Sequence, residues 1–409
     1  MKMCRMWCKP FVKFWVRAVE LRKMIRVLHA LDAFLPISQN WIYPQIKNVP
    51  GVEPAVLCGQ RANADLFTLE ASPVFSTAIS WTESLGMPRL VNSLAFRLDR
   101  QAPMLPSGVR DWNPKLIHAH FGTKGWDVLP FKRRLAVPLV TSFYGTDGWA
   151  LPESSQRWRE RLKVLFAQGE RFLVEGPAML SRLVELGCAA EKIQILRLGI
   201  NLSTVQFAGR DFTRTLTILM MARFVEKKGF VDGLKACSEA RRKGVDLSVR
   251  IIGDAVDGDS SGQQIKDQLQ EVAARPELRG CVTFDGFVKP DQARAIMREC
   301  NVFLCPSKHG ANRDGEGGSP LALTEAMAAG LLCIGTRHCD ISEVIKENET
   351  GYLCDSSDVS ALAALIGRVA QQPVEALALT RRGREHIEKN FSTAKQVVEL
   401  AEVYTRLTP

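Results

Sequence analysis

The 409-residue sequence lacks several patterns that would assign a function at once. No CxxC pair occurs among its eleven cysteines, no GxGxxG loop follows its first apolar run, and no stretch of 18 apolar residues is present. These absences exclude a paired-cysteine zinc site, a dinucleotide fingerprint and a membrane-spanning helix. The short spacings Cys4 to Cys8 and Cys300 to Cys305 have no histidine at ligand distance, so we expect no zinc there. The cysteines are odd in number and scattered, many of them inside apolar runs, which indicates buried thiols in a reducing cytosol.

Positive charge is concentrated at the N-terminus. The net charge is +10, and residues 1–23 carry seven Lys or Arg against one Glu. Apolar side chains recur between these cations at intervals of three and four residues, which is typical of a helix lying on an anionic membrane surface. The alternative is a natural start at Met24. No secretory signal is present, and the rest of the chain is too weakly basic, and too poor in known motifs, to predict nucleic-acid binding.

Short apolar runs rich in Val, Ile and Leu alternate with helical patterns along the whole chain. This alternation indicates buried parallel strands joined by helices, and the length favours two domains. We predict an α/β architecture of two doubly wound Rossmann-like units facing a cleft. The first unit has runs at 24–30, 54–58, 115–119, 138–143, 171–175 and 193–198, and the second at 216–221, 247–252, 281–284, 302–305, 332–336 and 351–354.

The predicted boundaries divide the chain into a basic segment (1–23), a first domain (24–205), a second domain (206–390) and a C-terminal helix (391–409). We expect this last segment to pack back onto the first domain. All eight tryptophans precede residue 160, so the first domain is the better place for a varied or amphipathic acceptor. Ligands of such sheets bind beyond the carboxyl ends of the strands, and functional residues are expected in post-strand loops.

A glycine-rich acidic loop follows the run at 302–305. It contains Glu316, Gly317, Gly318 and Ser319, and Ser319 is predicted to cap a helix that ends at Gly330. The exposed N–H groups and positive dipole end of such a helix favour phosphate or sugar oxygens. Glu325 lies within two turns of the helix start. Taken alone, the two glutamates could equally be solvated surface residues.

A pair of cations follows the first strand of the second domain, in MARFVEKKGF. Arg223 and Lys228 lie at a strand-to-helix junction and could both turn toward one diphosphate. An isolated pair at this spacing is common by chance, so solvated surface cations are the alternative.

Several of these segments together resemble family 4 retaining glycosyltransferases of the GT-B fold, including enzymes of exopolysaccharide and colanic-acid type. EGGSPLALTEAMAAG resembles the family's two-glutamate element, although eight residues separate the glutamates here, one more than usual. MARFVEKKGF resembles the phosphate-binding segment, with Ala222 in place of glycine. LRLGINLSTVQF, HAHFGT and TSFYGTD resemble further family segments, with Asn201 replacing Asp and Tyr144 replacing His. The resemblance spans residues 24–395.

The resemblance implies roles for individual residues. Arg223 and Lys228 would neutralise the leaving diphosphate, and Glu325 would bind the nucleoside ribose. The sugar hydroxyls would be bound by Glu316 and by the loop of Gly317, Gly318 and Ser319. In the first domain, Asp147 occupies the position of the family's Asp in the segment that TSFYGTD resembles. His120 would approach the sugar near the reacting bond. We expect His118 and His120 to point to opposite sides of their strand, with one of them facing the cleft. The remaining histidines are assigned no role.

The predicted function is retaining transfer of a hexose from a UDP- or GDP-sugar to a lipid-linked or polysaccharide acceptor in exopolysaccharide biosynthesis. The two cations would replace a catalytic metal, and no DxD pair suggests metal ligands, so no cofactor is expected. No side chain is an obvious nucleophile, which favours front-side attack assisted by the leaving phosphate. The alternatives are a nucleotide-sugar epimerase or hydrolase of the same fold, and a catalytically degenerate scaffold. We expect a cytoplasmic protein that binds the inner membrane face through residues 1–23.

Overall fold

The structure is a computed structural model that describes residues 24–69, 72–76, 101, 104–256 and 258–408. The basic segment 1–23 lies outside these residues, so its contact with a membrane stays a prediction. Among the helices of the described ranges, none combines the length and the apolar character needed to cross a bilayer.

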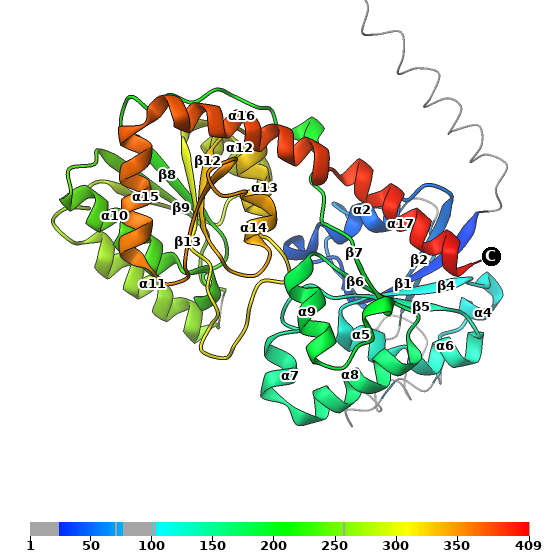
Figure 1. The fold of residues 1–409 in the computed structure, drawn as a ribbon. Helices are drawn as coiled ribbons and strands as arrows, with labels where there is room; N and C mark the ends of the chain where they lie inside the picture. The colour runs from blue at the N-terminus through cyan, green and yellow to red at the C-terminus, as the bar shows by residue number, and fades with distance from the viewer. Residues whose placement is uncertain (1–23, 70–71, 77–100, 102–103, 257, 409) are drawn as a thin grey trace, which may run out of the picture.

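Two separate parallel sheets form the framework, each with helices packed on both faces (Figure 1). The first sheet has seven strands in the order β3-β2-β1-β4-β5-β6-β7. Its strands are β1 (Ile25–Phe34), β2 (Val52–Arg61), β3 (Val74–Ser76), β4 (Leu116–His120), β5 (Leu139–Ser142), β6 (Arg171–Val174) and β7 (Ile193–Ile195). Its helices are α2 (Ile42–Lys47), α4 (Val109–Trp112), α5 (Gly122–Asp127), α6 (Leu129–Leu135), α7 (Ala150–Ser154), α8 (Gln156–Gln168) and α9 (Pro177–Glu185).

The second sheet has six strands in the order β10-β9-β8-β11-β12-β13. Its strands are β8 (Leu216–Met221), β9 (Leu247–Ile252), β10 (Val282–Gly286), β11 (Val302–Cys305), β12 (Leu332–Thr336) and β13 (Gly351–Cys354). Its helices are α10 (Phe230–Arg242), α11 (Ser260–Ala273), α12 (Pro290–Glu299), α13 (Leu321–Ala328), α14 (Ile341–Val344), α15 (Val359–Gln371) and α16 (Pro373–Asn390). The prediction of two doubly wound Rossmann-like units is confirmed.

The strand assignments follow from burial. Most residues of β8, β11 and β12 are buried, because helices cover both faces of the sheet, and such strands read as continuous Val, Ile and Leu runs. All twelve predicted strands are present, but β3 was missed because a three-residue edge strand carries too little pattern. β1 also extends to Phe34, four residues beyond the predicted end.

The last helix, α17 (Thr393–Leu407), returns from the second unit to the first (Figure 1). Tyr404 is buried there in a cluster that includes Val27 of β1 and Leu116 of β4. The chain joining the two units pairs with the start of α17 through Ile200 and Ser392. Asn201 caps the following turn by accepting a hydrogen bond from the Ser203 N–H at 3.1 Å, which is a role that Asp also fills.

The two units touch through polar contacts between post-strand loops. Arg197 pairs with Glu343 at 2.6 Å. The Ala178 N–H donates to the Asp340 carboxylate at 2.8 Å. The carboxyl ends of the two sheets therefore face each other, which is where doubly wound folds bind ligands.

Candidate active site at the domain interface

The acidic loop between β11 and α13 lies in this interface. α13 begins at Leu321 with Pro320 as its N-cap, and no side chain caps it, so the predicted cap at Ser319 was one residue too early. Pro320 has a ψ of 129°, which is an extended value, so the helical conformation begins only at the next residue. The predicted stop at Gly330 is confirmed by its φ of +89°, the left-handed conformation that ends helices.

Glu316 is buried in this loop, and its carboxylate accepts three hydrogen bonds from two side chains. The Lys228 ammonium lies 2.8 Å and 2.9 Å from its two carboxylate oxygens, and the Ser307 hydroxyl donates at 3.0 Å. Burial alone would raise the pKa of Glu316, but the charges of Lys228 and Lys227 and these hydrogen bonds together lower it. Glu316 is therefore an ionised carboxylate at neutral pH.

The glycines after Glu316 lie directly against the first domain. A Cβ on Gly317 would lie 1.9 Å from the Tyr144 carbonyl oxygen, and a Cβ on Gly318 would lie 2.2 Å from a Glu175 carboxylate oxygen. Only glycine permits so close an approach. Within the described chain, the backbone N–H groups of Gly317, Gly318 and Ser319 donate no hydrogen bond to another backbone group or side chain, so they are available to oxygen atoms of a ligand.

The two predicted cations occupy different environments. Lys228 is engaged with Glu316 and its side chain is only 17% exposed. Arg223 is exposed, and its guanidinium makes no hydrogen bond or ion pair with any described residue. Gly229, which follows Lys228, has a φ of +64°, and a Cβ there would lie 1.9 Å from the Pro306 carbonyl oxygen. This close contact brings the turn after β8 against the start of the acidic loop.

Glu325 lies on α13 and is partly buried. Its carboxylate makes no hydrogen bond or ion pair within the described residues. Burial raises its pKa, and the charge of Arg294 opposes that shift. A carboxylate in this state is a ready acceptor for ligand hydroxyl groups.

Asp147 is buried and fixes a loop of the first domain. Its carboxylate accepts backbone N–H groups of Gly122 at 2.8 Å, Gly145 at 3.0 Å and Tyr144 at 3.2 Å. Burial raises its pKa, and these hydrogen bonds counteract the rise. Asp147 thus holds Tyr144 and Gly145, which face the glycines of the acidic loop.

The prediction that His118 and His120 point to opposite sides of a strand was wrong. Residues two apart on a strand share a face, and the two rings lie 4.3 Å apart, both fully buried. His29 pairs with His118 in the β1–β4 register and joins the same group. Burial lowers the pKa of all three imidazoles, so they are neutral at pH 7.

Both ring nitrogens of His120 are occupied. Nδ1 lies 2.8 Å from the Tyr144 hydroxyl and Nε2 lies 3.1 Å from His29 Nδ1. His118 is bonded to the Tyr404 hydroxyl of α17 at 2.6 Å and to the Ser142 hydroxyl at 2.8 Å. The group connects the core of the first domain to the C-terminal helix at one end and to Tyr144 at the other.

Glu175 is a site residue that sequence reasoning missed. It directly follows β6, and it lies against Gly318 across the interface. Its pKa is raised well above the usual range by burial and by the charges of Asp340, Glu316 and Asp147. The two neighbouring carboxyl groups thus have pKa values shifted in opposite directions, that of Glu316 lowered and that of Glu175 raised. The available signal for Glu175 was its place as the last residue of the predicted strand 171–175, at the carboxyl end where ligands bind.

His309, His338 and Cys339, which no sequence pattern groups, lie together beside Glu316. The Glu316 N–H donates to His338 Nε2 at 3.4 Å. Burial lowers the pKa of His338 to about 4 and raises that of the Cys339 thiol to about 12. From the first domain, the Trp149 ring contacts His309 with 5.2 Å between ring centroids.

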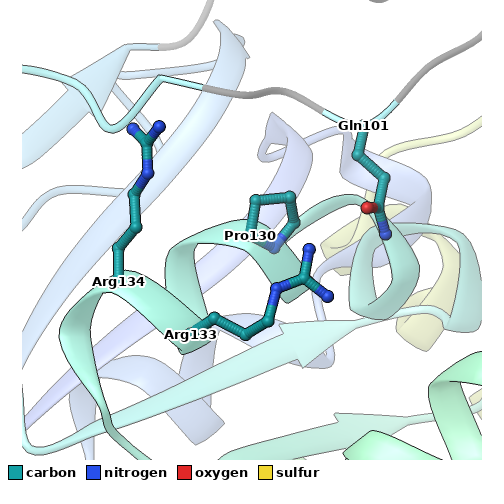
Figure 2. Close-up of a pocket in the computed structure, with 4 residues that line it drawn as sticks. All are labelled: Gln101, Pro130, Arg133 and Arg134. Carbon is teal, nitrogen blue, oxygen red and sulfur yellow. The ribbon is translucent and has the colours of Figure 1, made fainter.

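A shallow surface hollow of about 440 Å³ lies on the first domain, apart from these residues. Gln101, Pro130, Arg133 and Arg134 line it, the last three on α6 (Figure 2). None of the predicted site residues is among them. The candidate active site is thus defined by the side chains that meet at the domain interface.

Comparisons with known proteins agree with the fold. Residues 205–386 match the family described as Glycosyl transferases group 1, and residues 51–204 match Glycosyltransferase Family 4. The chain is 33% identical over 269 residues to the amylovoran biosynthesis glycosyltransferase AmsK of Erwinia amylovora, covering 66% of this chain and 64% of that protein. It is 30% identical over 298 residues to WcaL of Escherichia coli (strain K12), named for colanic acid biosynthesis, covering 71% and 70% of the two chains.

The fold resembles that of Anabaena HepE, solved in complex with UDP, with a TM-score of 0.75 and 15% identity over 94% of this chain and 100% of that one. This likeness establishes the GT-B arrangement of two Rossmann-like domains. The identity to WcaL extends over more than two thirds of both proteins. The chain therefore belongs to the family 4 glycosyltransferases, with the group 1 glycosyltransferase domain as its second half.

Proposed function

We propose that the protein transfers a hexose from a nucleotide sugar to an acceptor hydroxyl, with retention at the anomeric carbon. The observation that carries this proposal is the meeting of Lys228 and Glu316 at 2.8 Å beside backbone N–H groups that lack protein partners. The two residues follow β8 and β11, which are neighbours in the second sheet. A cation, an anion and backbone N–H groups without protein partners, all at the carboxyl edge of one sheet, suit a ligand that has both phosphate and hydroxyl groups.

The leaving diphosphate is bound by Arg223 and Lys228. Cleavage of the sugar–phosphate bond develops negative charge on the departing oxygen, and fixed cations at a site that excludes water stabilise that charge. Arg223 would break no hydrogen bond or ion pair within the described residues on binding phosphate, since its guanidinium makes none there. Lys228 shares its ammonium between Glu316 and the phosphate. The two cations supply the role of a metal, so transfer itself requires no metal cofactor.

The sugar and the nucleoside are bound on either side of the phosphates. Glu316 and the N–H groups of Gly317, Gly318 and Ser319 bind sugar hydroxyls, and Glu325 binds the ribose. The spacing of the two glutamates supports this division. They lie at opposite ends of a short stretch that runs from the interface into α13, and the Glu325 carboxylate has no partner in the described chain.

The first domain contributes His120, Tyr144 and Glu175. We infer that His120 approaches the sugar by exchanging its hydrogen bond with Tyr144 for one with the donor, since both its nitrogens are otherwise occupied. Asp147 positions Tyr144 through the backbone. The acceptor hydroxyl attacks from the same side as the leaving phosphate, which takes up its proton. Glu175, whose raised pKa favours the protonated carboxyl, donates a hydrogen bond to the bound sugar.

The relatives guide the choice of substrate. AmsK and WcaL are named for amylovoran and colanic acid biosynthesis, and HepE was solved with UDP. We therefore propose a UDP- or GDP-linked hexose as donor and a lipid-linked or polysaccharide acceptor in exopolysaccharide biosynthesis. The nine cysteines of the described chain are all free thiols, which supports a cytoplasmic location. Residues 1–23 would bring the enzyme to the anionic inner face of the membrane.

The test begins with a thermal-shift screen of UDP- and GDP-sugars, because a ligand that binds the folded state raises its melting temperature. The best donor is then used to measure transfer by Arg223→Ala and by Arg214→Ala. Arg214 is a matched control: its side chain is 86% exposed in the same domain. We expect kcat/KM to fall by about 10²- to 10³-fold in Arg223→Ala alone, with an unchanged melting temperature without ligand.

Equal turnover of the two variants would refute the phosphate assignment. Release of free sugar without acceptor at the rate of transfer would favour a hydrolase or epimerase. Failure of every nucleotide sugar to bind would favour a degenerate scaffold.

A further inference from the structure

Three side chains with metal-ligating atoms converge next to the acidic loop. His309 follows β11, and His338 and Cys339 follow β12, its neighbour in the sheet. One ligand atom from each lies within 4.8 Å of the other two. His338 Nε2 is 3.3 Å from Cys339 Sγ, and the rings of His309 and His338 have centroids 4.6 Å apart. The sheet topology thus gathers residues that are 29 to 30 positions apart in sequence.

The ligand types select the metal. Two imidazoles and a thiolate are typical of zinc and unsuited to magnesium or calcium, which prefer oxygen. With Zn–N near 2.0 Å and Zn–S near 2.3 Å, tetrahedral geometry separates nitrogen from sulfur by about 3.5 Å. The observed spacings, 3.3 Å for one pair and at most 4.8 Å for the others, need only small side-chain rotations to reach this value.

Gly315 lies directly against two of these side chains. A Cβ on Gly315 would lie 3.1 Å from His309 Cε1, 3.2 Å from His309 Nδ1 and 3.3 Å from Cys339 Sγ, so the absence of a side chain here lets His309 and Cys339 approach each other. Cys339 itself has a φ of +45°, a left-handed backbone conformation that side chains other than glycine and asparagine seldom adopt. That conformation places its thiol beside His338.

We propose that His309, His338 and Cys339 bind one zinc ion, with the fourth coordination position open. His309 is exposed, which provides an entry route. On binding, the Cys339 thiol releases its proton to solvent and coordinates as the thiolate. The surroundings hold both signs of charge: Lys227 pairs with Asp314, and Glu316 and Asp340 lie nearby. The ion is distinct from the transfer chemistry, which the two phosphate-binding cations serve.

Zinc binding would act on the acidic loop. His338 Nε2, the nitrogen beside the thiol, also accepts the Glu316 N–H. An ion on that nitrogen replaces this hydrogen bond and ties His309, seven residues before Glu316, to the loop after β12. Zinc would therefore hold the acidic loop in one position and release the Glu316 amide.

The experiment is a titration of the full-length protein with Co²⁺, which occupies zinc sites and absorbs light. We expect a near-ultraviolet thiolate-to-cobalt band and visible bands of a four-coordinate ion, both abolished by Zn²⁺. Cys339→Ser should remove the thiolate band of this site and weaken cobalt binding on the order of 100-fold. Loss of a residue that only hydrogen-bonds to a ligand already weakens metal binding by about 10- to 100-fold, and loss of a ligand should cost at least as much. Cys281→Ser is the matched control, because Cys281 is a partly exposed free thiol of the same domain.

His309→Ala provides a second variant on an exposed loop, which keeps the test valid if Cys339→Ser folds poorly. It should weaken cobalt binding to a similar degree, with an unchanged melting temperature without metal. All variants retain Cys4 and Cys8, so any cobalt bound by those thiols contributes equally to each spectrum. A thiolate-to-cobalt band as intense in Cys339→Ser as in the wild type, or one lost equally in Cys281→Ser, would overturn the proposal. Because no nucleotide sugar is present, the result does not depend on the transferase assignment.

Discussion

Replacement of Lys228 by methionine tests the electrostatic arrangement on which the site depends. The side chains of Lys228 and Glu316 are 17% and 8% exposed, and the ammonium contacts both carboxylate oxygens. Methionine has a similar length and removes the charge. The substitution therefore leaves an ionised carboxylate in a buried position without its principal partner.

The expected cost follows from the partners that remain. Removing one member of a buried ion pair typically destabilises a protein by about 3–5 kcal/mol. Ser307 still donates to Glu316 at 3.0 Å, and the charge of Lys227 still lowers its pKa. We therefore expect Lys228→Met to lower the free energy of unfolding by about 2–3 kcal/mol at pH 8, somewhat below that range.

The assay is urea unfolding of four proteins: the wild type, Lys228→Met, Glu316→Gln and the double variant. A coupling energy of about 2 kcal/mol between the two positions is expected, because the double variant has no unpaired charge. The pH dependence gives a second reading. In the wild type the pKa of Glu316 is lowered in the folded state from its usual value of 4.5. Its contribution to stability is therefore present above pH 4.5 and is lost as the pH falls through the pKa of the folded state.

Without Lys228, burial raises the pKa of Glu316, so the variant takes up a proton as the pH falls. The stability gap between wild type and Lys228→Met should therefore narrow from pH 8 to pH 5. A gap independent of pH, or a coupling energy near zero, would show that the two side chains are not paired in solution. Lys243→Met is the control: Lys243 pairs with Glu239 but is 57% exposed, so its loss should cost about 0.5 kcal/mol or less.

Two further substitutions test the backbone and the interface. Gly229→Ala should destabilise the protein by about 2–4 kcal/mol in the same unfolding assay, because its Cβ would lie 1.9 Å from the Pro306 oxygen. Gly244→Ala is the control: Gly244 also has a positive φ, but a Cβ there would have nothing within 4 Å, so the substitution should cost about 1 kcal/mol. Equal losses of stability in the two variants would contradict the close contact at Gly229. Burial raises the pKa of Asp340 to about 6, although the hydrogen bond from the Ala178 N–H opposes this shift. Asp340 therefore contributes stability at low pH, and this contribution is lost as the pH rises through 6. Relative to Asp340→Asn, the wild type should lose about 1–2 kcal/mol from pH 5 to pH 8, and parallel pH profiles would refute this.

Sequence patterns predicted the two sheets because parallel strands buried on both faces read as unbroken apolar runs. β8, β11 and β12 have the predicted bounds. The edge strand β3 has three partly exposed residues and therefore no such signature. The cap at Ser319 was misplaced because serine is the common capping residue, whereas the chain ends its loop at Pro320 with no side-chain cap.

The histidine error has a different origin. Strand residues alternate, so His118 and His120 share one face, and a correct reading of that periodicity would have paired them. Even so, no local pattern could have added His29, because its position opposite His118 depends on the β1–β4 register. The Tyr404 contact depends on the return of α17 over more than 280 residues.

Residues at the domain interface show where local reasoning can still be extended. Glu175 is the last residue of a predicted strand and Cys339 follows another, so the rule that ligands bind at the carboxyl ends of strands already pointed to their positions. What the rule cannot supply is the partner. Glu175 meets Gly318 only when the two sheets face each other, and Cys339 meets His309 only because β11 and β12 are adjacent. Post-strand polar residues in a doubly wound fold are therefore best considered as one set, to be grouped by sheet order before any single residue is dismissed as solvated.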